Sequence, residues 1–128
     1  MNLNQVTVPS LDIEKAISFY STLGLKLIVK SIPKYARFEC PEGDATFSVH
    51  KVEQLAKGPG IIIYFECHDL DEEVGRLVDE GFIFEELPKD QSWLWREARL
   101  RDPDNNQIVL FSAGTNRKNP PWRLDVLN

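Results

Sequence analysis

Two stretches of this chain match one another: DIEKAISFYSTLGL (residues 12–25) and DLDEEVGRLVDEGF (residues 69–82). They align at an offset of 57 positions, with an aspartate at the start of each stretch and a glycine near its end. A second match, at an offset of 62, relates ARFECPEG (residues 36–43) to ARLRDPDN (residues 98–105). The matching segments follow in the same order, so we interpret the chain as two copies of one unit that cannot bury its apolar face alone. We expect a cavity between the copies, and the functional site there.

Within each copy the residue pattern predicts one helix among strands. Apolar residues recur at helical spacing in the matching stretches, and Asp12 and Asp69 are expected to cap the helices that Gly24 and Gly81 end. Alternating patterns predict strands at residues 3–8, 25–30, 35–40 and 45–52 in the first copy, and at 61–67, 82–87, 92–101 and 107–112 in the second. Pro9 and Ser10 are expected to break the first strand. Each copy is therefore a βαβββ module, and the fold class is α+β.

The chain of 128 residues has the length of one domain. We predict a single domain over residues 1–128, with module one at about 1–52, a linker at 53–60, module two at about 61–113 and an irregular tail at 114–128. Trp122 in the tail is expected to dock on the domain itself or on a partner.

Composition narrows the function classes. A formal net charge of −5 argues against nucleic acid or an anionic membrane as a partner. The longest apolar run, residues 61–65, is too short to span a bilayer, and the first ten residues show no signal-peptide pattern. Cys40 and Cys67 lie singly in predicted strands, without CxxC spacing, and are expected to be reduced and buried. We therefore predict a cytoplasmic protein.

Several motifs carry a resemblance to a known family. They are Val8-x-x-x-Asp12, Phe19-Tyr20 and Leu23-Gly24 in the first module, and Tyr64-Phe65-x-x-x-Asp69 and Asp102-Pro103-Asp104-Asn105 in the second. Through them residues 3–112 resemble the vicinal oxygen chelate superfamily, which includes glyoxalase I, bleomycin- and fosfomycin-resistance proteins and extradiol dioxygenases. The resemblance implies a curled mixed sheet around a cup-shaped cavity, with the helices on the convex side. It also implies a homodimer, either side by side or with swapped modules.

The resemblance implies four inward positions that hold a divalent ion in the metalloenzymes of the family. In this chain they fall on Gln5, Ser48, Ile62 and Val109. Gln5 is a weak oxygen ligand and Ser48 a poor one, whereas Ile62 and Val109 cannot ligate. A catalytic divalent ion needs at least three ligands. We therefore expect no metal ligands and no cofactor.

Strand alternation places further side chains on these inward faces. His50 shares its face with Ser48, Tyr64 and Glu66 share theirs with Ile62, and Phe111 shares its face with Val109. An unorthodox metal site formed by His50, Glu66 and Gln5 stays open as the alternative.

The predicted strand at 92–101 carries unusual side chains for a sheet interior. Leu94, Ala98 and Leu100 suit the helix-packed side, which leaves Trp93, Trp95, Glu97 and Arg99 on the opposite face. By the resemblance that face lines the cup, and Arg37 in the matching segment of module one points inward as well.

Apolar walls with a few polar groups are typical of a pocket for an organic ligand. Arg37 and Arg99 would clamp a carboxylate or phosphate, while Trp93 and Trp95 would stack on a planar or cationic ligand. The alternative is that Glu97 pairs with an arginine only to satisfy a buried charge, and that the tryptophans fill a dimer interface.

The predicted ligand pocket consists of Gln5, Arg37, Ser48, His50, Tyr64, Glu66, Trp93, Trp95, Glu97, Arg99 and Phe111. We favour a glyoxalase/bleomycin-resistance-like protein that binds a small organic molecule between the modules without the usual divalent metal. One alternative is an enzyme: a lyase, isomerase or dioxygenase with an unorthodox metal site, or a metal-free enzyme that uses Glu97, His50 or Tyr64 as acid or base. The other is an interaction module whose tail around Trp122 docks on a partner.

Overall fold

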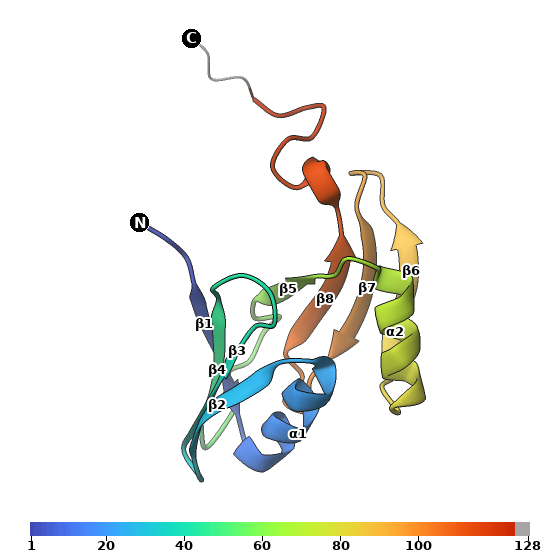
Figure 1. Cartoon of the computed structure of the whole chain (residues 1–128). Helices are drawn as coiled ribbons and strands as arrows, with labels where there is room; N and C mark the ends of the chain where they lie inside the picture. The colour runs from blue at the N-terminus through green and yellow to red at the C-terminus, as the bar shows by residue number, and fades with distance from the viewer. Residues whose placement is uncertain (125–128) are drawn as a thin grey trace. The chain divides into compact units, whose positions relative to one another are not determined.

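The computed structural model describes residues 1–124 and divides into two compact units. The first contains Met1–Ile61 and Arg101–Asn106, and the second contains Ile62–Leu100 and the chain from Gln107 onward. Each unit is a βαβββ module, as the internal repeat predicts, and Figure 1 shows one helix on one face of each sheet. One segment differs from the predicted modules. Residues 101–106, just before the last strand, were predicted in module two but belong with the first unit.

The first unit is built on a four-stranded mixed sheet. Its elements are β1 (Gln5–Ser10), α1 (Ile13–Leu23), β2 (Lys26–Ser31), β3 (Tyr35–Glu39) and β4 (Thr46–Lys51). The strand order is β1-β4-β3-β2, with β1 parallel to β4 and the other pairs antiparallel. The prediction that Pro9 and Ser10 break the first strand is wrong. Because β1 is an edge strand and pairs with β4 alone, the missing N–H of Pro9 costs it no ladder bond.

Helix α1 begins and ends where the sequence predicts. The Asp12 carboxylate accepts a hydrogen bond from the Lys15 backbone N–H at 3.2 Å, and Gly24 adopts φ 125° just past the last turn. The buried face of the helix packs on the apolar side of the sheet, where the Tyr20 ring lies 4.5 Å from the ring of Phe47, centroid to centroid. This side of the sheet is the core of the first unit.

A buried hydrogen-bond network joins α1 to the turn at Asp102–Asn106. The Asp102 carboxylate accepts from the Tyr20 hydroxyl at 2.5 Å, from the side-chain amide of Asn106 at 2.7 Å, and from the backbone N–H groups of Asp104 and Asn106 at 2.9 Å each. Asp104 in turn accepts from the Leu11 backbone N–H at 2.8 Å. The turn therefore fastens the β1–α1 connection by contacts that span up to 97 residues of sequence.

The same network makes a pH prediction for Tyr20. Burial, the charge and hydrogen bond of Asp102, and the charge of Asp104 all raise the pKa of Tyr20 far above its usual 10.0. A phenol with a raised folded-state pKa stabilises the fold fully below the unfolded pKa and loses that contribution as pH rises above it. Above about pH 10, wild type should therefore lose about 1.4 kcal/mol per pH unit relative to Tyr20→Phe. Urea unfolding of both proteins at about pH 9 and about pH 11 measures this; an unchanged difference between them would refute the assignment.

The second unit repeats the arrangement. Its elements are β5 (Ile62–Glu66), α2 (Leu70–Asp79), β6 (Phe84–Asp90), β7 (Arg96–Arg101), β8 (Gln107–Ser112) and a short 3₁₀ helix, η1 (Gly114–Asn116). The strand order is β5-β8-β7-β6, with β5 parallel to β8. Asp69 caps α2 as predicted, accepting from the Glu72 backbone N–H at 3.1 Å. The buried residues of α2 and the apolar side of the sheet form the core of this unit: Leu70, Val74, Leu77, Ala98, Leu100, Ile108 and Leu110.

The predicted strand at 92–101 begins late. Residues 92–94 form a turn instead, closed by hydrogen bonds from Leu94 N–H to the Gln91 carbonyl at 3.1 Å and from Gln91 N–H to the Trp95 carbonyl at 2.7 Å. Leu94 has φ 66° and is 49% exposed, so its predicted place on the helix-packed side is wrong. The preceding strand, β6, ends at Asp90, three residues later than the predicted end at residue 87.

The two cysteines are less buried than the sequence predicts. Cys40 and Cys67 are half-buried thiols that each directly follow the end of a strand, rather than fully buried strand residues. Burial raises the pKa of the Cys40 thiol.

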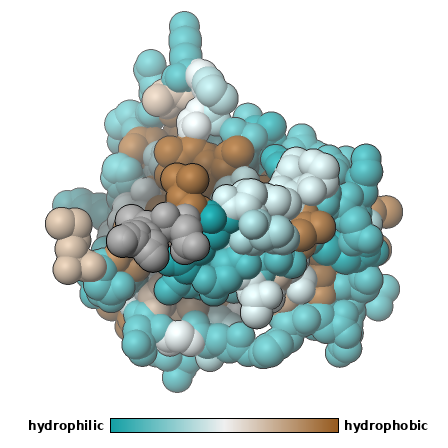
Figure 2. Space-filling model, turned by 90° about the horizontal axis from the view of Figure 1, so that it is seen from above, coloured by the Kyte–Doolittle hydropathy of each residue, from teal (hydrophilic) through white to brown (hydrophobic). Residues whose placement is uncertain are grey.

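No helix within residues 1–124 has the length and apolar character needed to cross a membrane. Viewed from the end where the tail leaves the second unit, the surface is mostly hydrophilic, with apolar side chains in separate areas (Figure 2).

Candidate functional site

The predicted site residues that belong to strands lie on the helix-free faces of the two sheets. In the first unit Arg37 pairs directly with Ser48 across β3 and β4, and His50 follows on the same face. In the second unit Tyr64 pairs with Val109 and Glu66 with Phe111 across β5 and β8. The parity argument from the sequence therefore selects the correct side of each strand. Whether these residues bind a ligand stays a prediction.

The helix-free face of the first unit is polar. Gln5 accepts from the Thr46 hydroxyl at 2.7 Å, and the fully buried Ser48 hydroxyl lies 2.6 Å from the hydroxyl of Thr7. Arg37 donates from Nε to the Tyr35 hydroxyl at 2.9 Å, with its guanidinium carbon 5.4 Å from the ring centre. Sequence reasoning missed Tyr35, although its i+2 spacing from Arg37 on one strand places both on this face.

His50 lies directly opposite Tyr35 in the β3–β4 ladder and is exposed. Gln5 pairs with Thr46 and Pro9 with His50, so four residues, roughly 13 Å of strand, separate Gln5 from His50. Because the oxygen of Gln5 is also taken by Thr46, the alternative metal site of His50, Glu66 and Gln5 finds no support in this unit.

The second unit holds an aromatic cluster, made of Tyr64, Trp95 and Phe111. Trp95 stacks on Phe111 with ring centroids 4.6 Å apart and an interplanar angle of 17°. Tyr64 meets both rings edge-on, at 5.9 Å from Trp95 and 5.8 Å from Phe111. Phe111 is buried while Tyr64 is 44% exposed, so the cluster presents an aromatic edge to the outside of this unit.

A carboxylate is buried on β7, close in sequence to this cluster. Glu97 is 1% exposed, and its two oxygens accept from Trp93 Nε1 at 2.9 Å and from Arg99 at 3.2 Å. Trp93 lies in the turn rather than on the strand, yet its indole reaches back to the predicted face. The alternative from the sequence was that Glu97 pairs with an arginine only to satisfy a buried charge. The Glu97–Arg99 ion pair is present, and it offsets part of the cost of burying the Glu97 charge. Glu66, by contrast, is exposed and lies 3.7 Å from Arg117.

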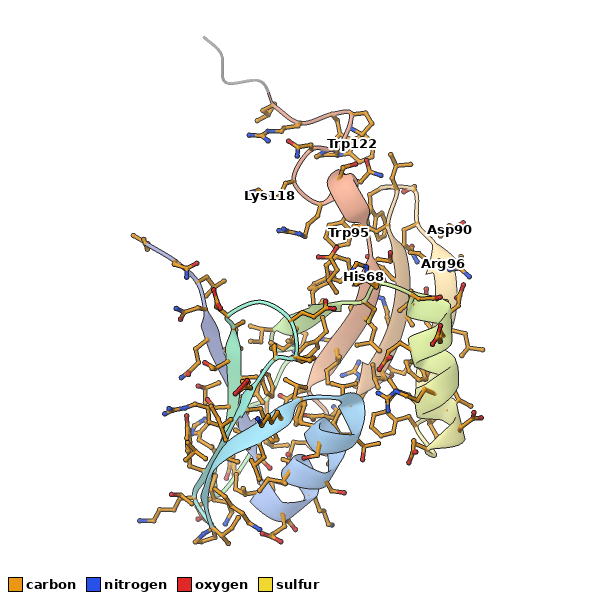
Figure 3. The ribbon with its side chains drawn as sticks, in the orientation of Figure 1. His68, Asp90, Trp95, Arg96, Lys118 and Trp122 are labelled. Atoms are coloured by element: carbon orange, nitrogen blue, oxygen red, sulfur yellow. The ribbon has the colours of Figure 1, made fainter. Side chains whose placement is uncertain are left out.

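A hollow of about 530 Å³ opens next to Trp95, between the β6–β7 turn, the end of β8 and η1. Its lining residues are Asp90, Gln91, Leu94, Trp95, Arg96, Ser112, Ala113, Gly114 and Asn116. Arg96 is held there by Asp71 and Asp90 at 3.0–3.2 Å. Figure 3 shows Asp90 and Arg96 together at this end of the sheet, with Lys118 and Trp122 on the tail segment beyond Trp95. The sequence did not predict this hollow, because it depends on the turn that replaces the first part of the expected strand.

The residues at the family's metal positions do not fit a catalytic divalent ion. In the first unit Gln5 and Ser48 are hydrogen-bonded to threonines, and in the second Ile62 and Val109 carry hydrocarbon side chains. A site with one or two weak oxygen donors falls short of the three ligands that catalytic ions require. Within residues 1–124, no three His, Cys, Asp or Glu side chains are grouped so that they would hold a metal.

Known structures share this fold over nearly the whole chain. A glyoxalase/bleomycin resistance protein/dioxygenase from Nocardioides is 22% identical, with a TM-score of 0.77, over 98% of this chain and 90% of that one. A bleomycin resistance determinant encoded on the transposon Tn5 is 19% identical, with a TM-score of 0.73, over 89% and 99%. Lactoylglutathione lyase from Agrobacterium tumefaciens is 18% identical, with a TM-score of 0.73, over 87% and 92%. At these identities the likeness shows the fold alone.

The comparison with curated proteins gives no match. A family model matches residues 2–110, which is most of the chain and includes both α-helices, strands β1 to β7 and the first part of β8. Together with the two βαβββ modules, this match places the chain in the Glyoxalase/Bleomycin resistance protein/Dioxygenase superfamily.

Proposed function

We propose that this protein binds a small organic anion with a planar apolar part, on the helix-free face of the second unit and without a divalent metal. The observation that carries the proposal is the combination on one short strand of a buried carboxylate, Glu97, with a partly exposed arginine, Arg99. The aromatic cluster supplies a surface against which a planar group would pack.

Arg99 is the group that would recognise the anion. One of its amino groups donates to Glu97, whose side chain is 1% exposed, while the Arg99 side chain is 33% exposed. Glu97 therefore orients a guanidinium whose other donors have no partner among the described residues. A planar guanidinium held in this way suits a carboxylate or phosphate, because both accept two parallel hydrogen bonds.

The fold does not choose between a binding protein and an enzyme, because both a resistance determinant and a lyase share it. The side chains favour binding. With Ile62 and Val109 at two of the four metal positions, the donor set lacks the ligands of the family's metalloenzymes. We therefore propose that the protein sequesters or carries its ligand.

The test is titration of ¹⁵N-labelled protein with benzoate, followed by NMR of the three indole N–H signals. The indole signals of Trp93 and Trp95 should shift, and the signal of Trp122 should stay in place as an internal control. The dissociation constant of benzoate should be about 1 mM, as expected for so small a ligand. Arg99→Ala should weaken binding by about 10–100-fold, because a charge-assisted contact is lost.

Arg76→Ala is the matched control, since it removes one positive charge from the exposed surface of α2. It should leave the benzoate affinity within about twofold of wild type. Equal losses of benzoate affinity in Arg99→Ala and Arg76→Ala, or no indole shift at all, would rule the proposal out.

We also propose, from the likeness to the family, that the protein is a homodimer. Sedimentation velocity on the same sample distinguishes monomer from dimer.

A further inference from the structure

The hollow beside Trp95 in the second unit breaks the internal repeat. In the first unit residues 32–34 alone join β2 to β3, whereas residues 91–95 join β6 to β7. This longer connection forms the walls of the hollow together with η1 and the end of β8. The volume of about 530 Å³ lies within the range of about 300–1,000 Å³ that is typical of ligand pockets. The repeated βαβββ fold does not require this hollow, so its side chains show what it is suited to hold.

The hollow differs in position from the helix-free face on which the proposed function rests. Asp90 pairs with Arg96 across β6 and β7, and Arg96 reaches Asp71 in the first turn of α2. These charged groups therefore lie on the helix side of the sheet. In the view of Figure 3, Asp90 and Arg96 lie on one side of Trp95 and Lys118 lies on the other.

The charge at the hollow is negative. One amino group of Arg96 lies 3.0 Å from Asp90 Oδ1, and its Nε and other amino group lie 3.2 and 3.1 Å from Asp71 Oδ1. Two carboxylates thus surround one guanidinium. Lys89 precedes Asp90 but pairs with Glu97 in the ladder, on the opposite face. The second unit also carries the whole formal net charge of −5, because acidic and basic residues are equal in number in the first. A cation is therefore favoured at the hollow and an anion is repelled.

Three lining residues carry an oxygen acceptor that has no partner among residues 1–124. In Asp90 only Oδ1 is bonded, which leaves Oδ2. The Gln91 amide group donates from Nε2, which leaves its oxygen, and the Ser112 hydroxyl is the third. An ammonium group has three N–H donors and no acceptor, so this set suits it. Leu94 and Trp95 supply an apolar wall beside the acceptors.

We propose that the hollow binds a primary ammonium group attached to a small apolar group. Asp90 supplies the opposite charge, and Gln91 and Ser112 accept hydrogen bonds from the ammonium. The apolar part packs on Leu94 and Trp95, whose indole also attracts a cation. This site goes beyond the proposed function, which takes an anion on the other face of the sheet.

The probe is benzylammonium, and benzyl alcohol is its neutral counterpart of nearly the same shape. At low ionic strength, NMR titration of ¹⁵N-labelled wild type should show benzylammonium binding about 3–10-fold more tightly than benzyl alcohol, with shifts of the Trp95 indole and Gln91 side-chain amide signals. Asp90→Asn keeps the shape, removes the charge and should abolish that preference. Asp79→Asn, the same change at an exposed residue of α2 outside the hollow, should leave the affinity within about twofold.

Arg96→Gln gives a second measurement, since it removes the positive charge between the two carboxylates. With folding checked by circular dichroism, benzylammonium should bind Arg96→Gln about 2–4-fold more tightly than wild type. Weaker binding by folded Arg96→Gln, or equal affinities of wild type and Asp90→Asn, would overturn the proposal. So would equal affinities of benzylammonium and benzyl alcohol for wild type. Asp90→Asn should keep benzoate binding through Arg99 within about twofold, so either proposal can fail without the other.

Discussion

Replacing Asp102 by alanine is expected to lower the free energy of unfolding by about 3–5 kcal/mol. The carboxylate is 6% exposed and accepts four hydrogen bonds, from two side chains and two backbone N–H groups. Its loss leaves the Tyr20 hydroxyl and the turn's N–H groups without their acceptor inside the protein. A buried donor left without a partner costs about 1–3 kcal/mol, and four donors lose theirs together.

Tyr20→Phe is the matched control, because it removes one of the four bonds and keeps the ring in the core. It should cost about 1–2 kcal/mol, well below the loss in Asp102→Ala. Urea unfolding followed by far-UV circular dichroism measures both, since all three tryptophans lie outside the first unit and report on it poorly. If Asp102→Ala is no less stable than Tyr20→Phe, the hydrogen bonds of Asp102 do not stabilise the first unit as proposed.

Replacing Trp95 by alanine is expected to destabilise the second unit by about 2–4 kcal/mol. The side chain is half-buried, stacks on Phe111 and donates from Nε1 to the Asn116 carbonyl at 3.3 Å. The substitution therefore removes aromatic packing and frees η1 from the start of β7. Trypsin should then cut faster at Arg117 and Lys118, the residues that follow η1.

Trp122→Ala provides the comparison for Trp95→Ala. Trp122 is 55% exposed and lies on the tail segment, so its removal should change stability by less than about 0.5 kcal/mol. Trp95→Phe keeps the stacking and loses only the hydrogen bond, which predicts an intermediate loss of about 1 kcal/mol. Similar melting temperatures for Trp95→Ala and Trp122→Ala would contradict the role given to the aromatic cluster.

The elements were predictable from sequence where local chemistry determines them. Asp12 and Asp69 cap their helices with carboxylates that bond to the third residue beyond, and the last strand has the predicted bounds, Gln107–Ser112. The start of β7 was not predictable, because Trp93 and Trp95 have strong strand preferences and are spaced two residues apart, as residues on one face of a strand are. The hairpin turn that overrides this preference depends on pairing with β6, a contact that no local pattern reveals.

The faces of the candidate site were predictable and its partners were not. Period-two alternation placed Arg37 with Ser48, and Tyr64 with Phe111, on the correct sides of their strands. Tyr35 was missed because its hydrogen bond from Arg37 and its place opposite His50 are visible only in the fold. The Asp102 turn resembled a family motif in sequence, but its bond to Tyr20 joins residues 82 apart and is visible only in the fold.

The most direct test of metal-independent anion binding is benzoate titration of one protein sample in two states. One portion is treated with a chelator and shown by elemental mass spectrometry to lack metal, and the other is supplied with zinc, nickel or manganese. We predict the same shifts of the Trp93 and Trp95 indole signals in both portions, with dissociation constants that agree within about twofold and rise on Arg99→Ala. Benzoate binding that appears only with near-stoichiometric metal would contradict the account.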